Sequence, residues 1–141
     1  MMESAGLERF DDSWHLLGAP DRALAYVYLC GYVVELCLKC AILTLAGVPR
    51  QGDAYGQCRA LPVRSVKNHD LPQLASVLIQ RRARLPANPV LDGQIRDYAN
   101  LAAAEWSEEL RYRAGVANEG DALRMIEIAD WFVQNRMRAR L

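Results

Sequence analysis

The sequence contains few histidines, no β-strand pattern and no excess of positive or negative charge. Only His15 and His69 occur among its 141 residues, so imidazole chemistry is restricted to two positions. No segment alternates apolar and polar residues over a useful length, and we therefore predict no sheet. The 17 basic and 17 acidic side chains balance, which gives no global field to attract nucleic acid or a membrane. Because 52% of the residues are hydrophobic, we expect one ordered domain over residues 1–141.

The sequence also lacks a long uncharged run. Residues 23–34 carry no charge, but this stretch is short of the roughly 18–20 residues that a membrane span needs. Glu35 and Lys39 interrupt the apolar sequence that follows. Glu3 and Glu8 stand where a signal peptide would have its basic and apolar regions. These features predict a soluble, cytoplasmic protein without membrane contact.

Apolar side chains at three- and four-residue spacing predict five helices and an all-α, antiparallel up-and-down bundle of four or five helices. The helices are expected over about residues 3–17, 22–46, 70–84, 90–105 and 120–138. Asp21 is the predicted cap of the second helix, and Gly47 is its predicted end. This second helix is apolar nearly all round and should be the central element. Residues 47–69 form a long connection, expected to be a lid, a binding loop or a mobile segment.

Four cysteines raise the question of disulfides or a metal. Cys30, Cys37 and Cys40 fall on the predicted second helix, where Cys30 and Cys37 are about 10 Å apart along the axis, too far to bridge. Cys37 and Cys40 form a CxxC pair without the turn that presents two thiolates to one ion. With Cys58 and His69 they make a conceivable zinc set, but the spacing matches no usual pattern. We expect reduced, packed cysteines and no metal or cofactor.

Three segments in order carry a family resemblance. They are "GYVVELCLKC" at residues 31–40, "NHDLPQLASVL" at 68–78 and "EWSEELRY" at 105–112. Together with the number of helices, they resemble the HEPN domain (higher eukaryotes and prokaryotes nucleotide-binding). One prokaryotic branch of that family carries a Gly-Tyr-x-x-Glu-x-x-x-Lys helix, a His-Asp-Leu helix start and a Trp…Arg-Tyr element.

The resemblance implies a helical bundle that is frequently dimeric. It also implies work in toxin–antitoxin, phage-defence or RNA-processing systems, often beside a nucleotidyltransferase-type protein partner, and binding of nucleotide or RNA. Catalytic relatives are metal-independent ribonucleases with an Arg-x(4–6)-His motif in a cleft between two protomers. There the His serves as acid or base, and the Arg stabilises the phosphate as charge develops.

An Arg-x4-His match is present from Arg64 to His69. It precedes the His-Asp-Leu helix start, whereas catalytic relatives carry the pair near a late helix. Arg111 has the more suitable late position, but no His follows it at the required distance. The leading hypothesis is therefore a non-catalytic binding or interaction module that forms homodimers. The alternatives are a metal-independent endoribonuclease using Arg64 and His69, and a structural subunit of a two-protein nucleotidyltransferase system.

A polar cluster is the predicted site. Glu35 and Lys39 have the favourable i, i+4 order, and Gly31 on the same face allows a neighbouring backbone to approach. We expect Glu35 to reach across the bundle to Arg111, because a buried carboxylate needs a partner. Lys39 is expected toward the rim. The cluster also takes in Tyr112, His69 and Asp70, the last two at a helix start.

This cluster has two possible roles. Either it is architectural, or it opens into a cleft where Arg111, Lys39 and His69 receive a phosphate or carboxylate. Two further expectations concern the surface. Basic side chains at a helix end, Arg81, Arg82 and Arg84, should be solvated. A surplus of aromatic residues favours a dimer, namely Trp14, Trp131, Tyr26 and Tyr28.

Overall fold

The computed structural model describes residues 2–16, 22–47, 69–112 and 117–140, and within these ranges every regular element is a helix. The elements are α1 (Met2–Leu16), α2 (Ala23–Leu45), α4 (Leu71–Arg82), α5 (Pro89–Glu105), η3 (Glu108–Tyr112), α6 (Glu119–Asn135) and η4 (Arg138–Arg140). The prediction of an all-α bundle is confirmed. The two short 3₁₀ helices, η3 and η4, were not predicted.

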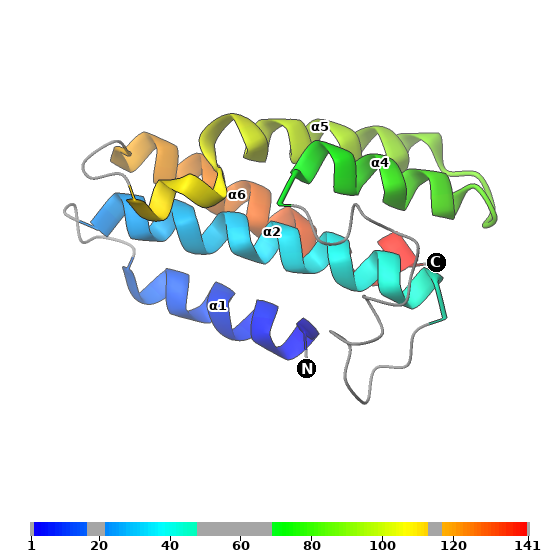
Figure 1. Cartoon of the computed structure of the whole chain (residues 1–141), viewed down its shortest axis with the longest axis horizontal. Coiled ribbons are helices and arrows are strands. Elements are labelled where there is room, and N and C mark those ends of the chain that lie inside the picture. Colours follow the sequence, from blue (N-terminus) through cyan, green and yellow to red (C-terminus); the bar gives the residue numbers. More distant parts are fainter. Residues whose placement is uncertain (1, 17–21, 48–68, 113–116, 141) are drawn as a thin grey trace.

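α2 is the central helix of the bundle. It contacts α1, α4, α5 and α6 as well as η3 and η4 (Figure 1). The pairs α1/α2, α4/α5 and α5/α6 run antiparallel, and α4 runs in the same direction as α2. This central position follows from the composition of α2, which is apolar nearly all round and buries residues on all its faces.

α2 also has the length and composition of a membrane span. Its best window has a mean hydropathy of 1.7, and 67% of that window is buried inside the bundle. The short uncharged run argues against a membrane span, whereas the mean hydropathy of α2 is high enough for one. A core helix satisfies the hydropathy criterion as well as a span does, and the bundle buries α2 as a core helix.

The helix ends follow local chemistry. The Asp70 carboxylate accepts a hydrogen bond from the Gln73 backbone N–H at 2.9 Å, so Asp70 is the N-cap of α4. Asn118 and Asp121 form a capping box at the start of α6. Gly47 follows α2 with φ of +73°, a conformation that favours glycine. The predicted cap of α2 is wrong, since Arg22 is at the N-cap position without a side-chain bond; Asp21 lies outside the described residues.

Arg82 corrects a second expectation. Its side chain is only 3% exposed, and its Nε donates to Asp92 Oδ1 at 2.7 Å. Its Nη1 donates to the carbonyl oxygens of Arg138 and Ala139 at 3.1 and 3.0 Å. Arg82 therefore joins α4 to α5 and to the C-terminal η4, whereas Arg84 is exposed as predicted.

The predicted apolar faces are mostly buried. The stripes of α4 and α6 are buried in full, including Leu74, Leu78, Met125 and Phe132. Leu101 on α5 is an exception, since it is apolar and 56% exposed. Among the aromatic residues expected as a surface surplus, Tyr26 is buried, Tyr28 and Trp131 are partly buried, and Trp14 is 49% exposed. The apolar surplus is thus smaller than the sequence suggested.

Candidate functional site

Glu35 is a buried carboxylate in the middle of α2, and both its oxygens have partners. Lys39 Nζ, one turn further along α2, donates to Glu35 Oε1 at 2.5 Å. His69 Nδ1 lies 2.8 Å from Glu35 Oε2, and the nitrogen must carry the proton because a carboxylate only accepts. The Glu35 side chain is 3% exposed. The bundle therefore supplies the partners that a buried charge requires.

His69 connects Glu35 to the bundle surface. It precedes the N-cap of α4, and its second ring nitrogen, Nε2, lies 3.3 Å from Glu108 Oε2 on η3. His69 is 34% exposed and Glu108 is 39% exposed. We name Glu35, Lys39, His69 and Glu108 the Glu35 cluster. The cluster joins α2, η3 and the residue directly before the N-cap of α4, three parts of the chain that are far apart in sequence.

The Glu35 cluster carries two carboxylates, one ammonium group and one imidazole. Asp70 is the next acidic neighbour along the chain, but its carboxylate is bound to its own helix start. The cluster therefore has no surplus of positive charge among these side chains, and both nitrogens of His69 face carboxylate oxygens. A phosphate would have to displace Glu108 to reach His69.

Trp106 lies beside the cluster and explains Gly31. A Cβ on Gly31 would be 2.1 Å from Cδ1 and from Cγ of the Trp106 ring, so only glycine leaves room for this indole. Trp106 Nε1 donates to the carbonyl oxygen of Tyr28 at 3.1 Å. Gly31 was expected to admit a neighbouring backbone, and it admits an aromatic ring instead. The same contact holds the segment from Trp106 into η3 against α2.

The face of α2 beside η3 thus has an aromatic half and a charged half. Tyr28 and Tyr32, both partly buried, have ring centroids 6.1 Å apart, and Tyr28 lies 6.5 Å from Trp106. Glu35 and Lys39 follow on the same face, because positions 28, 32, 35 and 39 are spaced by three or four residues.

The predicted site is reproduced in part. Glu35, Lys39 and His69 meet, and Asp70 caps α4 rather than joining the cluster. Lys39 was placed toward the rim, which is wrong, since its side chain is 11% exposed. Glu108 was missed because an acidic residue near a helix end is usually solvated.

Some predicted site residues lie outside the described part of the chain. Arg64 is one of them. Arg111 and Tyr112 belong to η3, which contacts α2, but their side chains are not described. The pairing of Glu35 with Arg111 therefore stays a prediction. The two oxygens of Glu35 already have Lys39 and His69 as partners, so such a pairing would have to share them.

Three of the four cysteines lie on α2, in the part of the chain that the structure describes. Cys30, Cys37 and Cys40 form no disulfide, and Cys58 lies outside the described residues. Among the residues that the structure describes, no group of three or more His, Cys, Asp and Glu side chains could hold a metal ion. Burial raises the pKa of Cys30 to about 11, which keeps this thiol protonated and unreactive at neutral pH.

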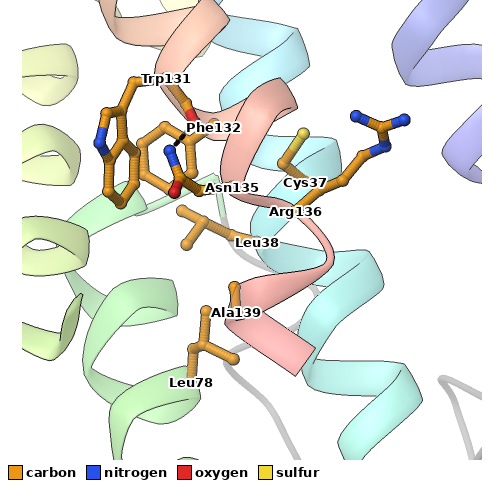
Figure 2. A pocket seen from close by; sticks show the side chains of 8 residues that line it. All are labelled: Cys37, Leu38, Leu78, Trp131, Phe132, Asn135, Arg136 and Ala139. Atoms are coloured by element: carbon orange, nitrogen blue, oxygen red, sulfur yellow. Dashed lines mark hydrogen bonds between the residues drawn. The ribbon is translucent and has the colours of Figure 1, made fainter. Parts of the chain in front are cut away.

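A small pocket lies between α2, α4 and the C-terminal part of the chain (Figure 2). Its lining is mostly apolar: Cys37, Leu38, Leu78, Trp131, Phe132, Asn135, Arg136 and Ala139. The Asn135 amide donates to the Trp131 carbonyl oxygen at 2.9 Å, and Arg136 donates to the carbonyl oxygen of Val133. Both polar side chains thus donate to backbone carbonyl groups, although Arg136 Nε, 3.6 Å from Glu3 Oε1, makes no hydrogen bond within the described residues. The Glu35 cluster, in which every carboxylate oxygen of Glu35 has a partner and a path to the surface, remains the better candidate site.

No family model, curated protein or solved structure matches this chain. The class of protein that the fold and the site define is an all-α bundle with a buried, paired carboxylate that reaches the surface through one histidine.

Proposed function

We propose that this chain is a non-catalytic binding and interaction module of the HEPN type. It acts as a homodimer and associates with a protein partner, a nucleotide or RNA in a defence, toxin–antitoxin or stress-related system. One observation carries the proposal: the three sequence segments that bear the resemblance contribute to one place in the bundle. The first supplies Gly31, Glu35 and Lys39, the second His69, and the third Trp106 and Glu108.

The geometry of His69 favours binding over catalysis. An acid or base that cleaves RNA needs a ring nitrogen within reach of the substrate. Here Nδ1 is held by Glu35, and Nε2 faces Glu108. Among the described residues, no arginine side chain lies beside this imidazole to stabilise a phosphate. A module that recognises a ligand or partner needs no such free nitrogen.

The test combines three measurements on one preparation. Light scattering at tens of micromolar, the range of ordinary weak dimers, is expected to give the mass of a dimer. Labelled single-stranded RNA and a fluorescent ATP analogue are titrated in EDTA at neutral pH, and at least one is expected to bind. The RNA is expected to stay intact. A monomer that binds neither probe contradicts the proposal.

The protein partner is tested separately. Genes of two-protein systems lie side by side, so the product of the neighbouring gene is co-expressed with this chain. We expect the two proteins to co-purify from the soluble, cytoplasmic fraction. Recovery of this chain in the membrane fraction would contradict the expected location, and it is a necessary control because α2 has the hydropathy of a span.

The second candidate is a metal-independent endoribonuclease using Arg64 and His69. The observation that favours it is the buried Glu35 carboxylate on Nδ1 of His69, which would orient the ring and fix which nitrogen carries the hydrogen. Displacement of the half-exposed Glu108 by substrate would then free Nε2. Cleavage in EDTA that is lost in both Arg64→Ala and His69→Ala, and kept in His15→Ala, would establish this activity. Melting curves of the three variants separate lost chemistry from lost folding.

A further inference from the structure

The end of α4 and the C-terminal η4 lie at the same end of the bundle and carry several arginines (Figure 1). Arg81 is in the last turn of α4, Arg84 follows in the turn beyond it, and Arg138 begins η4. The buried Arg82 joins the two segments, since its Nη1 donates to the carbonyl oxygen of Arg138, 56 positions further along the chain, at 3.1 Å. We name Arg81, Arg84 and Arg138 the arginine patch.

The charges of the arginine patch have no acidic partner among the described residues. Arg84 and Arg138 are exposed, and Arg81 is partly exposed. In the described ranges, the side chains of Arg81 and Arg84 make no hydrogen bond or ion pair. Arg138 Nη1 donates to the amide oxygen of Asn135 at 3.1 Å, which is a neutral acceptor and does not compensate the charge. All three guanidinium groups therefore keep their positive charge unpaired.

Acidic side chains beside these segments serve other arginines. Asp92 Oδ1 accepts from Nε of the buried Arg82 at 2.7 Å. Glu3 Oε1 lies 3.6 Å from Nε of Arg136. The 17 basic and 17 acidic side chains of the whole chain balance, so the positive excess at this end of the bundle is local. A local excess of one sign attracts a ligand of the opposite charge even when the net charge is zero.

We propose that the arginine patch binds the phosphate backbone of single-stranded RNA. The planar guanidinium group donates two parallel hydrogen bonds to one phosphate, a geometry that an ammonium group lacks. The patch contains no aromatic side chain on which a base would stack, so it holds the backbone and does not read the sequence. The inference rests on the RNA-binding part of the proposed function, and it adds where the RNA lies.

The arginine patch is separate from the Glu35 cluster. His69 directly precedes the N-cap of α4, whereas Arg81 and Arg84 are at the other end of this helix of 12 residues, which is about 18 Å long. The two places are therefore accessible to independent mutations. Basic side chains in the last turn of a helix also suit its dipole, which accounts for Arg81. That explanation does not extend to Arg138, which begins η4.

Fluorescence anisotropy with two labelled single-stranded RNAs of unrelated sequence tests the patch. Binding is measured in EDTA between about 50 and 200 mM salt. The triple variant Arg81→Gln, Arg84→Gln and Arg138→Gln is expected to bind both RNAs about ten-fold or more weakly at the lowest salt. The slope of log affinity against log salt should become smaller by about 2, because each phosphate contact to a single strand contributes about 0.7.

Two further variants separate the patch from net charge and from folding. The matched control, Arg9→Gln with Arg22→Gln and Arg96→Gln, removes three positive charges at exposed positions elsewhere and is expected to keep the affinity and the slope. Replacing the three arginines of the patch by lysine keeps the charges, so most of the affinity should remain. Circular dichroism confirms that each variant is folded.

The outcomes distinguish a failure of the patch from a failure of the proposed function. RNA binding that the triple Gln variant of the patch retains, or that the matched control loses equally, would overturn the patch and leave the proposed function in place. Binding of the ATP analogue without RNA would do the same. Displacement of the RNA by polyglutamate, or by phosphatidylglycerol vesicles, at equal charge concentration would overturn the patch in favour of an acidic protein or a membrane surface. A monomer that binds neither RNA nor the ATP analogue contradicts both proposals.

Discussion

Trp106 occupies the space that any side chain larger than hydrogen would take on Gly31. A Cβ at position 31 would come within 2.1 Å of Cδ1 and Cγ and within 2.5 Å of Cδ2 of the indole. These atoms are at the base of a rigid, buried ring, which cannot turn aside without giving up the hydrogen bond from Nε1 to Tyr28. The contact joins two of the segments that converge on the Glu35 cluster.

We predict that Gly31→Ala destabilises the protein. Alanine is the better helix former by about 1 kcal/mol, but the displaced indole costs about 1–3 kcal/mol or more as overpacking. A net loss of up to about 2 kcal/mol in the free energy of unfolding is expected. Gly93→Ala is the matched control, since Gly93 lies inside α5 with nothing within 4 Å of a Cβ. That variant should gain up to about 1 kcal/mol. Urea unfolding measures the free energy of unfolding of both variants. Changes of the same sign in the two variants would contradict the prediction.

Removing one member of the Glu35–Lys39 pair should cost more than removing both. Glu35→Ala leaves the Lys39 ammonium buried without its carboxylate, and we expect a loss of about 3–5 kcal/mol. Replacing the pair by Glu35→Leu with Lys39→Met puts apolar side chains in an apolar helix, so the loss should be smaller than in Glu35→Ala. Thermal melts of the single and double variants measure the difference. An equal or larger loss in the double variant would show that the pair has a net stabilising effect of its own.

Arg82 should be the one arginine at the end of α4 whose loss matters. Arg82→Ala leaves the Asp92 carboxylate and two carbonyl oxygens of the C-terminal segment without their donor. We expect a loss of about 3 kcal/mol or more. Arg82→Lys should recover little, because an ammonium group cannot reach three acceptors with the geometry of a guanidinium. Arg84→Ala, at an exposed position of similar sequence context, should change stability by less than about 0.5 kcal/mol. Similar melting temperatures for Arg82→Ala and Arg84→Ala would contradict this assignment.

The helices could be predicted from the sequence because they depend on local patterns. The helix over about residues 120–138, the helix start at Asp70 and the glycine end at Gly47 each follow from residues within one or two turns. Leu101 cannot be assigned to a face from its apolar character alone, because it is adjacent in sequence to Ala102, which continues the buried stripe through Leu91 and Ile95. One residue corresponds to about 100° around a helix, which turns Leu101 to solvent.

The site could be predicted only where its contacts are local or where a motif indicated them. Lys39 follows Glu35 by one turn, and His69 came from the family resemblance. Glu108 contacts His69, which lies 39 positions earlier in the chain, and Arg82 contacts residues up to 57 positions later. Nothing in the local sequence distinguishes these two charged side chains from the solvated ones beside them. Long-range packing alone decides which charge is buried.

Because the Cys30 thiol is buried, we predict that the protein loses stability at alkaline pH. Burial raises the pKa of its thiol from 9.0 to about 11, while the nearby Ser13 and Tyr26 side chains lower it by a smaller amount. Below pH 9 the thiol is protonated in both states and stability is unaffected. Between pH 9 and pH 11 mainly the unfolded chain releases this proton, so the free energy of unfolding falls by about 1.4 kcal/mol per pH unit.

This effect is measured by urea unfolding at about pH 8 and about pH 10.5, in the unmodified protein and in Cys30→Ala. The cavity left by Cys30→Ala lowers stability equally at both values, so the difference in pH dependence isolates the thiol. We expect the unmodified protein to lose about 2 kcal/mol more than the variant over this interval. Burial also raises the pKa of Tyr26, which acts in the same direction and is present in both proteins. Cys30 adds to that shift, so its removal also takes away a smaller part of the effect of Tyr26. An identical pH dependence in the two proteins would show that the Cys30 thiolate is accommodated in the folded bundle, against the desolvation that its complete burial implies.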